Sequence, residues 1–152
     1  MKLSDHFELD EFLAHGDPVK PTEAQIDNLR RLASWVLEPL RKQLGRPLGI
    51  NSGFRSPAYN IQIGGAPKSQ HCQGIAADIA IGEDAACLVA AALASKIPSV
   101  GGIGIYPGRG FIHVDIRPKN GGKATWWCEV EGKYQPLTEK IKSGLKAVGA
   151  LL

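Results

Sequence analysis

The chain has 152 residues, of which 43% are hydrophobic and 22% charged, and its formal net charge is +3. This length suits one domain, so we expect a single domain over residues 1–152 and a monomer. The weak, dispersed basic charge argues against nucleic acid as the main partner, and no run of about 18 apolar residues exists that could span a membrane. The N-terminus lacks the apolar stretch of a secretory signal, so we expect synthesis in the cytoplasm and a separate exit route for any action outside.

The N-terminal third of the chain is expected to hold one long helix. Residues 1–21 are predicted to be irregular. Thr22 and Gln25 then form a capping box, in which each side chain satisfies a free N–H of the first helical turn. Apolar residues recur at helical spacing after it. Pro39 predicts a kink or break in this helix, and Gly45 is expected to end it.

The rest of the chain mixes short strands with two helices. A long loop is expected at 54–68 because this stretch is rich in glycine and proline. Strands are expected at 48–52, 76–81, 102–106, 111–117 and 125–130, and helices at 83–95 and 138–151. A turn after the last strand is expected to lead into a short strand that pairs with it. This order predicts an α+β fold: a small, largely antiparallel sheet with flanking helices.

The segment FIHVDIR, residues 111–117, carries polar residues at alternate positions. Side chains alternate across a strand, so His113, Asp115 and Arg117 are expected on one face and the isoleucines and valine on the other. The apolar face belongs to a core. The polar face is costly to bury unless its groups serve one another or a metal.

The segment SQHCQGIAAD, residues 69–78, sets His71 and Asp78 seven residues apart among small side chains. Together with His113 they form a possible set of two histidines and one carboxylate, which suits a zinc ion that keeps a position open for water. An alternative is a hydrogen-bonded Asp–His pair in the core. His6 and His15 lie in the polar N-terminal segment and are expected at the surface.

Two longer stretches resemble the peptidase M15 family of zinc peptidases acting on peptidoglycan: NSGFRSPAYNIQIGGAPKSQHCQGIAADIAI and GIGIYPGRGFIHVDIR. The family signature S-x-H-x-x-G-x-A-x-D is met from Ser69 to Asp78. The element S-G-[FY]-R-S-P is met from Ser52 to Pro57, and the later H-x-D element at His113 and Asp115. The family includes D-alanyl-D-alanine carboxypeptidases and phage endolysins that cut L-alanyl-D-glutamate bonds.

The resemblance implies that His71, Asp78 and His113 bind Zn²⁺ in a cleft of the sheet. Asp115 shares a strand face with His113, so its carboxylate could reach a zinc-bound water, and we expect it to be the general base. Several branches of the family place a glutamate three residues before the last histidine, but that position is Gly110 here. The alternative role for Asp115 is to orient a ligand histidine.

The resemblance also points to residues that contact the substrate. Arg55 is expected to bind a substrate carboxylate or carbonyl, and the alternative is a surface arginine that pairs with a nearby acid. Ser69 is expected to bond the substrate or a ligand, or else to cap a loop. Tyr106 is expected to line the cleft or to pack. Trp126 and Trp127 alternate along a strand, so at most one of them faces the cleft.

The function that the resemblance implies is zinc-dependent hydrolysis of an amide bond in the stem peptide of peptidoglycan. The bond is expected to be of the D-Ala-D-Ala carboxypeptidase or the L-Ala-D-Glu endopeptidase type. A phage or prophage lysis enzyme, acting on the cell wall after release by another route, fits the small domain. The alternatives are a non-catalytic zinc-containing module that binds wall or protein, and a metal-free domain.

Overall fold

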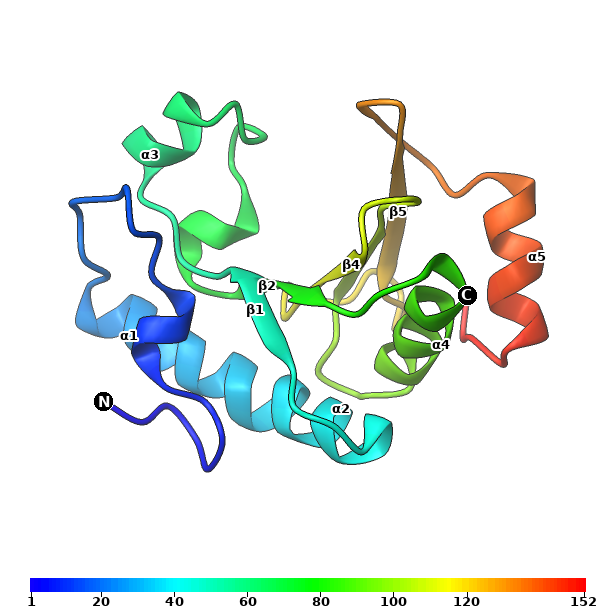
Figure 1. Ribbon diagram of the computed structural model, residues 1–152, viewed down its shortest axis with the longest axis horizontal. Helices are drawn as coiled ribbons and strands as arrows, with labels where there is room; N and C mark the ends of the chain where they lie inside the picture. Colours follow the sequence, from blue (N-terminus) through cyan, green and yellow to red (C-terminus); the bar gives the residue numbers. More distant parts are fainter.

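A six-stranded sheet runs through the middle of the molecule, with its strands in the order β1-β2-β4-β3-β5-β6 (Figure 1). The computed structural model describes residues 1–152. All neighbouring strands are antiparallel except β3 and β5, which are parallel. This confirms the expected α+β fold with a largely antiparallel sheet. The strands are β1 Gly49–Ser52, β2 Ala76–Ala80, β3 Gly102–Ile105, β4 Phe111–Asp115, β5 Thr125–Val130 and β6 Lys133–Gln135.

Five α-helices and three shorter helical turns accompany the sheet. Thr22 and Gln25 form the expected capping box, and Gly45 ends the long N-terminal helical segment in the left-handed conformation at φ 68°. No helix has the length and apolar character that crossing a lipid bilayer would require. The helices are α1 Glu23–Leu32, α2 Glu38–Leu44, α3 Pro57–Gln62, α4 Asp84–Ser95 and α5 Glu139–Ala147, and the turns are η1 Leu9–Phe12, η2 Ala33–Leu37 and η3 Gln70–Gln73.

Pro39 produces a local change of helical pitch. Between α1 and α2 the chain makes a π-helical turn, η2, in which the Glu38 N–H donates to the Ala33 carbonyl five residues back. A proline ring clashes with the carbonyl four residues before it in a regular α-helix, and insertion of an extra residue in the turn is a known way to relieve such a conflict. The predicted irregularity is therefore present, and α1, η2 and α2 follow one another without a loop.

The predicted loop at 54–68 is wrong in one respect, because it contains helix α3. Ser56 is its N-cap and accepts a hydrogen bond from the Tyr59 N–H at 3.2 Å, and Pro57 occupies the first helical position. Proline suits that position because its missing N–H would have no partner there. The Asp17 carboxylate accepts hydrogen bonds from the Ser56 N–H at 2.7 Å and hydroxyl at 2.8 Å, which ties α3 to the N-terminal segment.

The sheet has one apolar and one polar face around β2 and β4. Ala77 and Ile79 of β2 and Ile112 and Val114 of β4 have no exposed surface and belong to a core of 28 buried residues. Helix α4 packs against β3 and β4 on this side and also contacts α2 and α5. The intervening residues of β2 and β4 point to the opposite face, which is where the polar side chains collect.

Candidate metal centre

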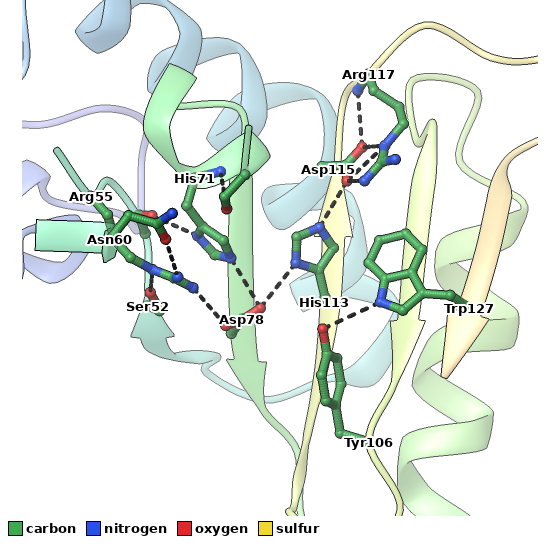
Figure 2. A network of polar contacts seen from close by, with 12 residues as sticks. Ser52, Arg55, Asn60, His71, Asp78, Tyr106, His113, Asp115, Arg117 and Trp127 are labelled. Carbon is green, nitrogen blue, oxygen red and sulfur yellow. Dashed lines mark hydrogen bonds and ion pairs between the residues drawn. The ribbon is translucent and has the colours of Figure 1, made fainter. Parts of the chain in front are cut away.

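His71, Asp78 and His113 converge on one point of the polar face. Each offers one ligand atom, and the three atoms lie within 4.8 Å of one another. The Asp78 Oδ1 atom is 3.3 Å from His71 Nε2 and 3.1 Å from His113 Nδ1 (Figure 2). The three residues predicted as ligands are thus brought together from η3, β2 and β4.

Local structure explains why these three side chains meet. In the antiparallel pairing of β2 and β4, Asp78 is the direct partner of His113, and side chains of directly paired residues lie on the same face. His71 precedes β2 in the η3 turn, which ends at Gly74 in the left-handed conformation at φ 75°. A Cβ at Gly74 would lie 2.7 Å from the Gln25 carbonyl oxygen, so glycine lets this turn pack closely on α1.

The second ring nitrogen of each histidine has a partner behind the site. His71 Nδ1 donates to the Gly53 carbonyl oxygen at 2.7 Å, and His113 Nε2 donates to Asp115 Oδ2 at 2.8 Å. A proton held on that nitrogen leaves the other nitrogen with its lone pair free. Both free lone pairs then point to the side of the rings where Asp78 lies. In zinc sites, ligand histidines are oriented in the same way, by hydrogen bonds from their second ring nitrogen.

The charges of the three groups suit a cation. Burial alone would raise the pKa of Asp78, but contact with the His113 and His71 rings, each of which can donate to this carboxylate when it carries a second proton, outweighs burial and holds that pKa well below the usual range. Burial lowers the pKa of His71, which favours the neutral ring that a metal needs. For His113, the bonds to Asp115 and Asp78 outweigh burial and raise the pKa. A metal that binds at this site therefore competes with a proton on His113.

These residues fit a zinc ion. Two imidazole nitrogens and one carboxylate oxygen are donors that zinc prefers, and three protein ligands leave a position open, whereas structural zinc sites usually have four. The three groups line a cavity of about 490 Å³ that opens to the surface. This cavity, called the cleft below, gives a substrate access to the open position.

Asp115 lies on the other side of the His113 ring from Asp78 (Figure 2). It has no exposed surface, and its carboxylate accepts hydrogen bonds from the backbone N–H and the guanidinium of Arg117 at 2.6–3.0 Å. Burial alone would raise its pKa, but the bonds to His113 and Arg117 lower it to about 2. This placement does not support the expected role of general base and favours the alternative, orientation of His113.

Arg55 lies directly beside the metal ligands. Its guanidinium donates to Ser52 Oγ at 3.1 Å and to Asn60 Oδ1 at 2.8 Å, and Nη2 is 3.7 Å from Asp78 Oδ2. Only 13% of the side chain is exposed. Arg55 thus pairs with a nearby acid, but it is not the surface arginine of the alternative, and it lines the cleft where a substrate group would enter.

Ser69 and Tyr106 both line the cleft. The Ser69 hydroxyl accepts a hydrogen bond from the His71 N–H at 3.2 Å, so it caps the η3 turn as the alternative expected. Tyr106 is 7% exposed, and burial, which is the largest cause, raises the pKa of its hydroxyl. The group is therefore neutral at physiological pH.

Only one of the two tryptophans of β5 faces the cleft, as predicted. Trp127 lines it, and its indole centroid lies 4.9 Å from that of the His113 ring. Trp126 packs against the core and donates to the Leu151 carbonyl at 3.2 Å. His6 and His15 are exposed, also as predicted.

The cleft also contains residues that the sequence analysis did not single out. Arg109 and Glu129 form an ion pair of 2.6 Å on its wall. Glu129 is two residues after Trp127 on β5, so strand alternation places both on the same face. That spacing was the available signal for Glu129. Arg109 lies in a glycine-rich turn, where no periodicity predicts a direction.

Comparison with known proteins gives two similarities. A family model described as peptidase M15 matches residues 5–115. The chain is also similar to a zinc D-Ala-D-Ala carboxypeptidase from Streptomyces albus G, with 36% identity over 95 residues. That match covers 61% of this chain and 35% of the relative, so the chain accounts for only about a third of that protein's length.

Proposed function

This chain belongs to the peptidase M15 family, and we propose that it is a zinc-dependent peptidase that hydrolyses an amide bond in the stem peptide of peptidoglycan. The observation that carries the proposal is the convergence of His71, Asp78 and His113, with their donor atoms within 4.8 Å, at the base of an open cleft. Similarity to a zinc D-Ala-D-Ala carboxypeptidase supports the choice of substrate.

Each residue of the site has a definite task in this proposal. His71, Asp78 and His113 would hold a zinc ion, which would supply Lewis acidity for the activation of water and the polarisation of an amide carbonyl. The Gly53 carbonyl and Asp115 fix the two imidazole rings so that their free nitrogens face the ion. Arg55, fixed by Ser52 and Asn60, stands beside Asp78 and is placed to bind a carboxylate or carbonyl of the peptide.

A terminal D-Ala-D-Ala bond is the first candidate for the bond that is cut. It is the bond named for the relative from Streptomyces albus G, and Arg55 offers a guanidinium, which matches the planar geometry of a terminal carboxylate. The acyl side of the bond would then lie toward the Trp127 and Tyr106 wall of the cleft.

An internal bond such as L-Ala-D-Glu is the second candidate, and a specific feature favours it. A second cavity, of about 680 Å³, shares Arg55 and Ile63 with the cleft. It is lined further by polar groups of the N-terminal segment and α3, among them Asp10, His15 and Tyr59. Open space on both sides of Arg55 suits a peptide that continues past the scissile bond.

The place of action follows from the substrate. Stem peptides lie in the cell wall, so we propose that the protein acts there as a monomer, in a phage-type or prophage-type lytic setting. Loss of turbidity of a peptidoglycan suspension tests lysis. A fall in turbidity that stops when a chelator is added and resumes when zinc is restored supports the proposal.

The decisive experiment uses defined muropeptides and mass spectrometry. The zinc-loaded protein is expected to release D-alanine if the terminal bond is cut, or to give fragments ending in L-alanine if the internal bond is cut. Chelated protein and a His113→Ala variant, which removes a ligand, should release neither. Binding of the zinc-loaded protein to the wall without any fragment would instead support the non-catalytic module.

A further inference from the structure

We propose that the Tyr106 hydroxyl is a catalytic hydrogen-bond donor to the oxyanion that develops on the substrate's carbonyl oxygen when water adds to the scissile amide. The inference rests on the proposed function and deepens it, because it adds a residue that acts on the reacting atoms. No proton leaves Tyr106 in this role. The group only donates a hydrogen bond that strengthens as negative charge builds up on the oxygen.

The side chain of Tyr106 lies in the same cleft as the three metal ligands. Tyr106 follows β3, and its ring stacks on that of Phe111 with centroids 4.4 Å apart. It lines the same cleft as His71, Asp78 and His113. In Figure 2 the phenol points up toward the His113 ring, with its oxygen between that ring and Trp127. The carbonyl of a peptide bound in the cleft beside these ligands would come within reach of this oxygen.

Trp127 determines which way the phenolic proton points. The indole Nε1 lies 3.4 Å from Tyr106 Oη and donates to it. An indole N–H is only a donor, so the phenol oxygen is the acceptor and its own proton is left to donate elsewhere. The Tyr134 hydroxyl accepts a hydrogen bond from Tyr106, but Tyr134 is 60% exposed, so a substrate oxygen in the cleft can replace it as the acceptor.

A glycine on β3 makes this arrangement possible. A Cβ at Gly104 would lie 2.7 Å from Cε2 and 2.8 Å from Nε1 of Trp127. One edge of the indole therefore packs directly against the glycine, and the indole also lies 4.9 Å from the His113 ring and 4.9 Å from the Arg117 guanidinium. Packing on several sides fixes the indole, and through it the phenol, relative to the ligands. A donor fixed before the reaction needs no reorganisation during it.

The test compares Tyr106→Phe with Ser143→Ala, in which an exposed hydroxyl is removed from α5, outside both cavities. We expect Tyr106→Phe to lower kcat by about 100-fold with KM changed by less than about twofold and with one zinc per chain retained. A second readout is the affinity for a phosphinate analogue of the scissile dipeptide, whose tetrahedral oxygens imitate the oxyanion. Its Kd should rise by a similar factor, while the Kd of the peptide product that carries the new carboxylate stays the same. Ser143→Ala should match the wild type in every measurement.

The possible failures are distinct. If Tyr106→Phe has the same kcat as an active wild type, this inference alone is overturned. It is also overturned if the variant binds the phosphinate and the product more weakly by the same factor, because that would indicate a role in packing. A wild-type protein that cuts no muropeptide overturns the proposed function and this inference with it.

Discussion

Two aspartates of the polar face show how surroundings assign a role to a residue. Asp78 directs one oxygen at both histidines and lies beside the cleft. Asp115 is fully buried behind His113 and held by Arg117. The first is available to an ion, whereas the second is available only to the imidazole, so one side-chain type serves as ligand and as positioning group.

Replacement of Asp115 separates its two possible roles. Asp115→Ala removes the acceptor of the His113 Nε2–H, so the ring loses its fixed orientation, and we expect zinc affinity to fall by about 10–100-fold. A titration against a competing chelator measures this. Unchanged zinc affinity combined with lost turnover would instead identify Asp115 as the general base. His6→Ala, at an exposed histidine, serves as the control.

Asp17 gives a prediction about pH. Burial alone would raise its pKa, but hydrogen bonds from Ser56 and Val19 outweigh it and lower that pKa. The stability it contributes is therefore complete above the unfolded-state pKa of about 3.9 and is lost as pH falls through the lower folded-state pKa. We expect Asp17→Asn to lower the free energy of unfolding by about 1–3 kcal/mol at pH 7, and by less at pH 3.

Urea unfolding measures the free energy of unfolding of wild type and Asp17→Asn at pH 7 and pH 3. Both proteins are used without metal, so that protonation of the ligand histidines affects them equally. A difference between wild type and Asp17→Asn that is as large at pH 3 as at pH 7 would contradict the account of this carboxylate.

At the scale of elements, β3 shows how one strand shapes both faces of the sheet. Ile103 and Ile105 fill the core, while Gly102 and Gly104 leave space on the polar face. A Cβ at Gly102 would lie 2.4 Å from Asp115 Oδ2. The two glycines therefore let the groups behind and beside His113 approach the backbone of the strand.

We expect Gly104→Ala to displace the Trp127 indole. The cost of such overpacking is about 1–3 kcal/mol of unfolding free energy, and misplacement of groups around the site should lower kcat by at least about tenfold. Urea unfolding and muropeptide turnover measure the two effects. Gly49→Ala on β1 is the matched control, since its Cβ would meet only Ala80 at an ordinary 3.6 Å. Equal behaviour of the two variants would contradict the role given to Gly104.

The elements could be predicted where local signals agree with the final structure. The capping box at Thr22, the end at Gly45 and the alternation in β4 all report local geometry. Helix α3 was missed because glycine and proline were counted as loop formers, although Pro57 after Ser56 is a helix start. The convergence of His71 with His113, 42 residues later, depends on strand pairing, which no local pattern contains; the family resemblance supplied it.

At the scale of the whole molecule, metal binding should be linked to stability. The free donor atoms of the site cluster only in the folded chain, so an ion bound to them stabilises that state by about 2.7 kcal/mol at 100 times its Kd. For a protein of this size, chelation should lower Tm by about 5–10 °C. Differential scanning calorimetry with chelator, and then with excess zinc, measures the loss and its return. An unchanged Tm would argue for a metal-free domain.

The central claim is that three side chains distant in sequence bind one zinc ion in a site open to substrate. The most direct measurement is a crystal structure of the zinc-loaded protein with anomalous data at the zinc edge. The account predicts one strong peak in the cleft, about 2.0–2.2 Å from His71 Nε2, an Asp78 oxygen and His113 Nδ1. A zinc-loaded crystal with its peak elsewhere, or with His113 bound through Nε2 instead, would contradict it.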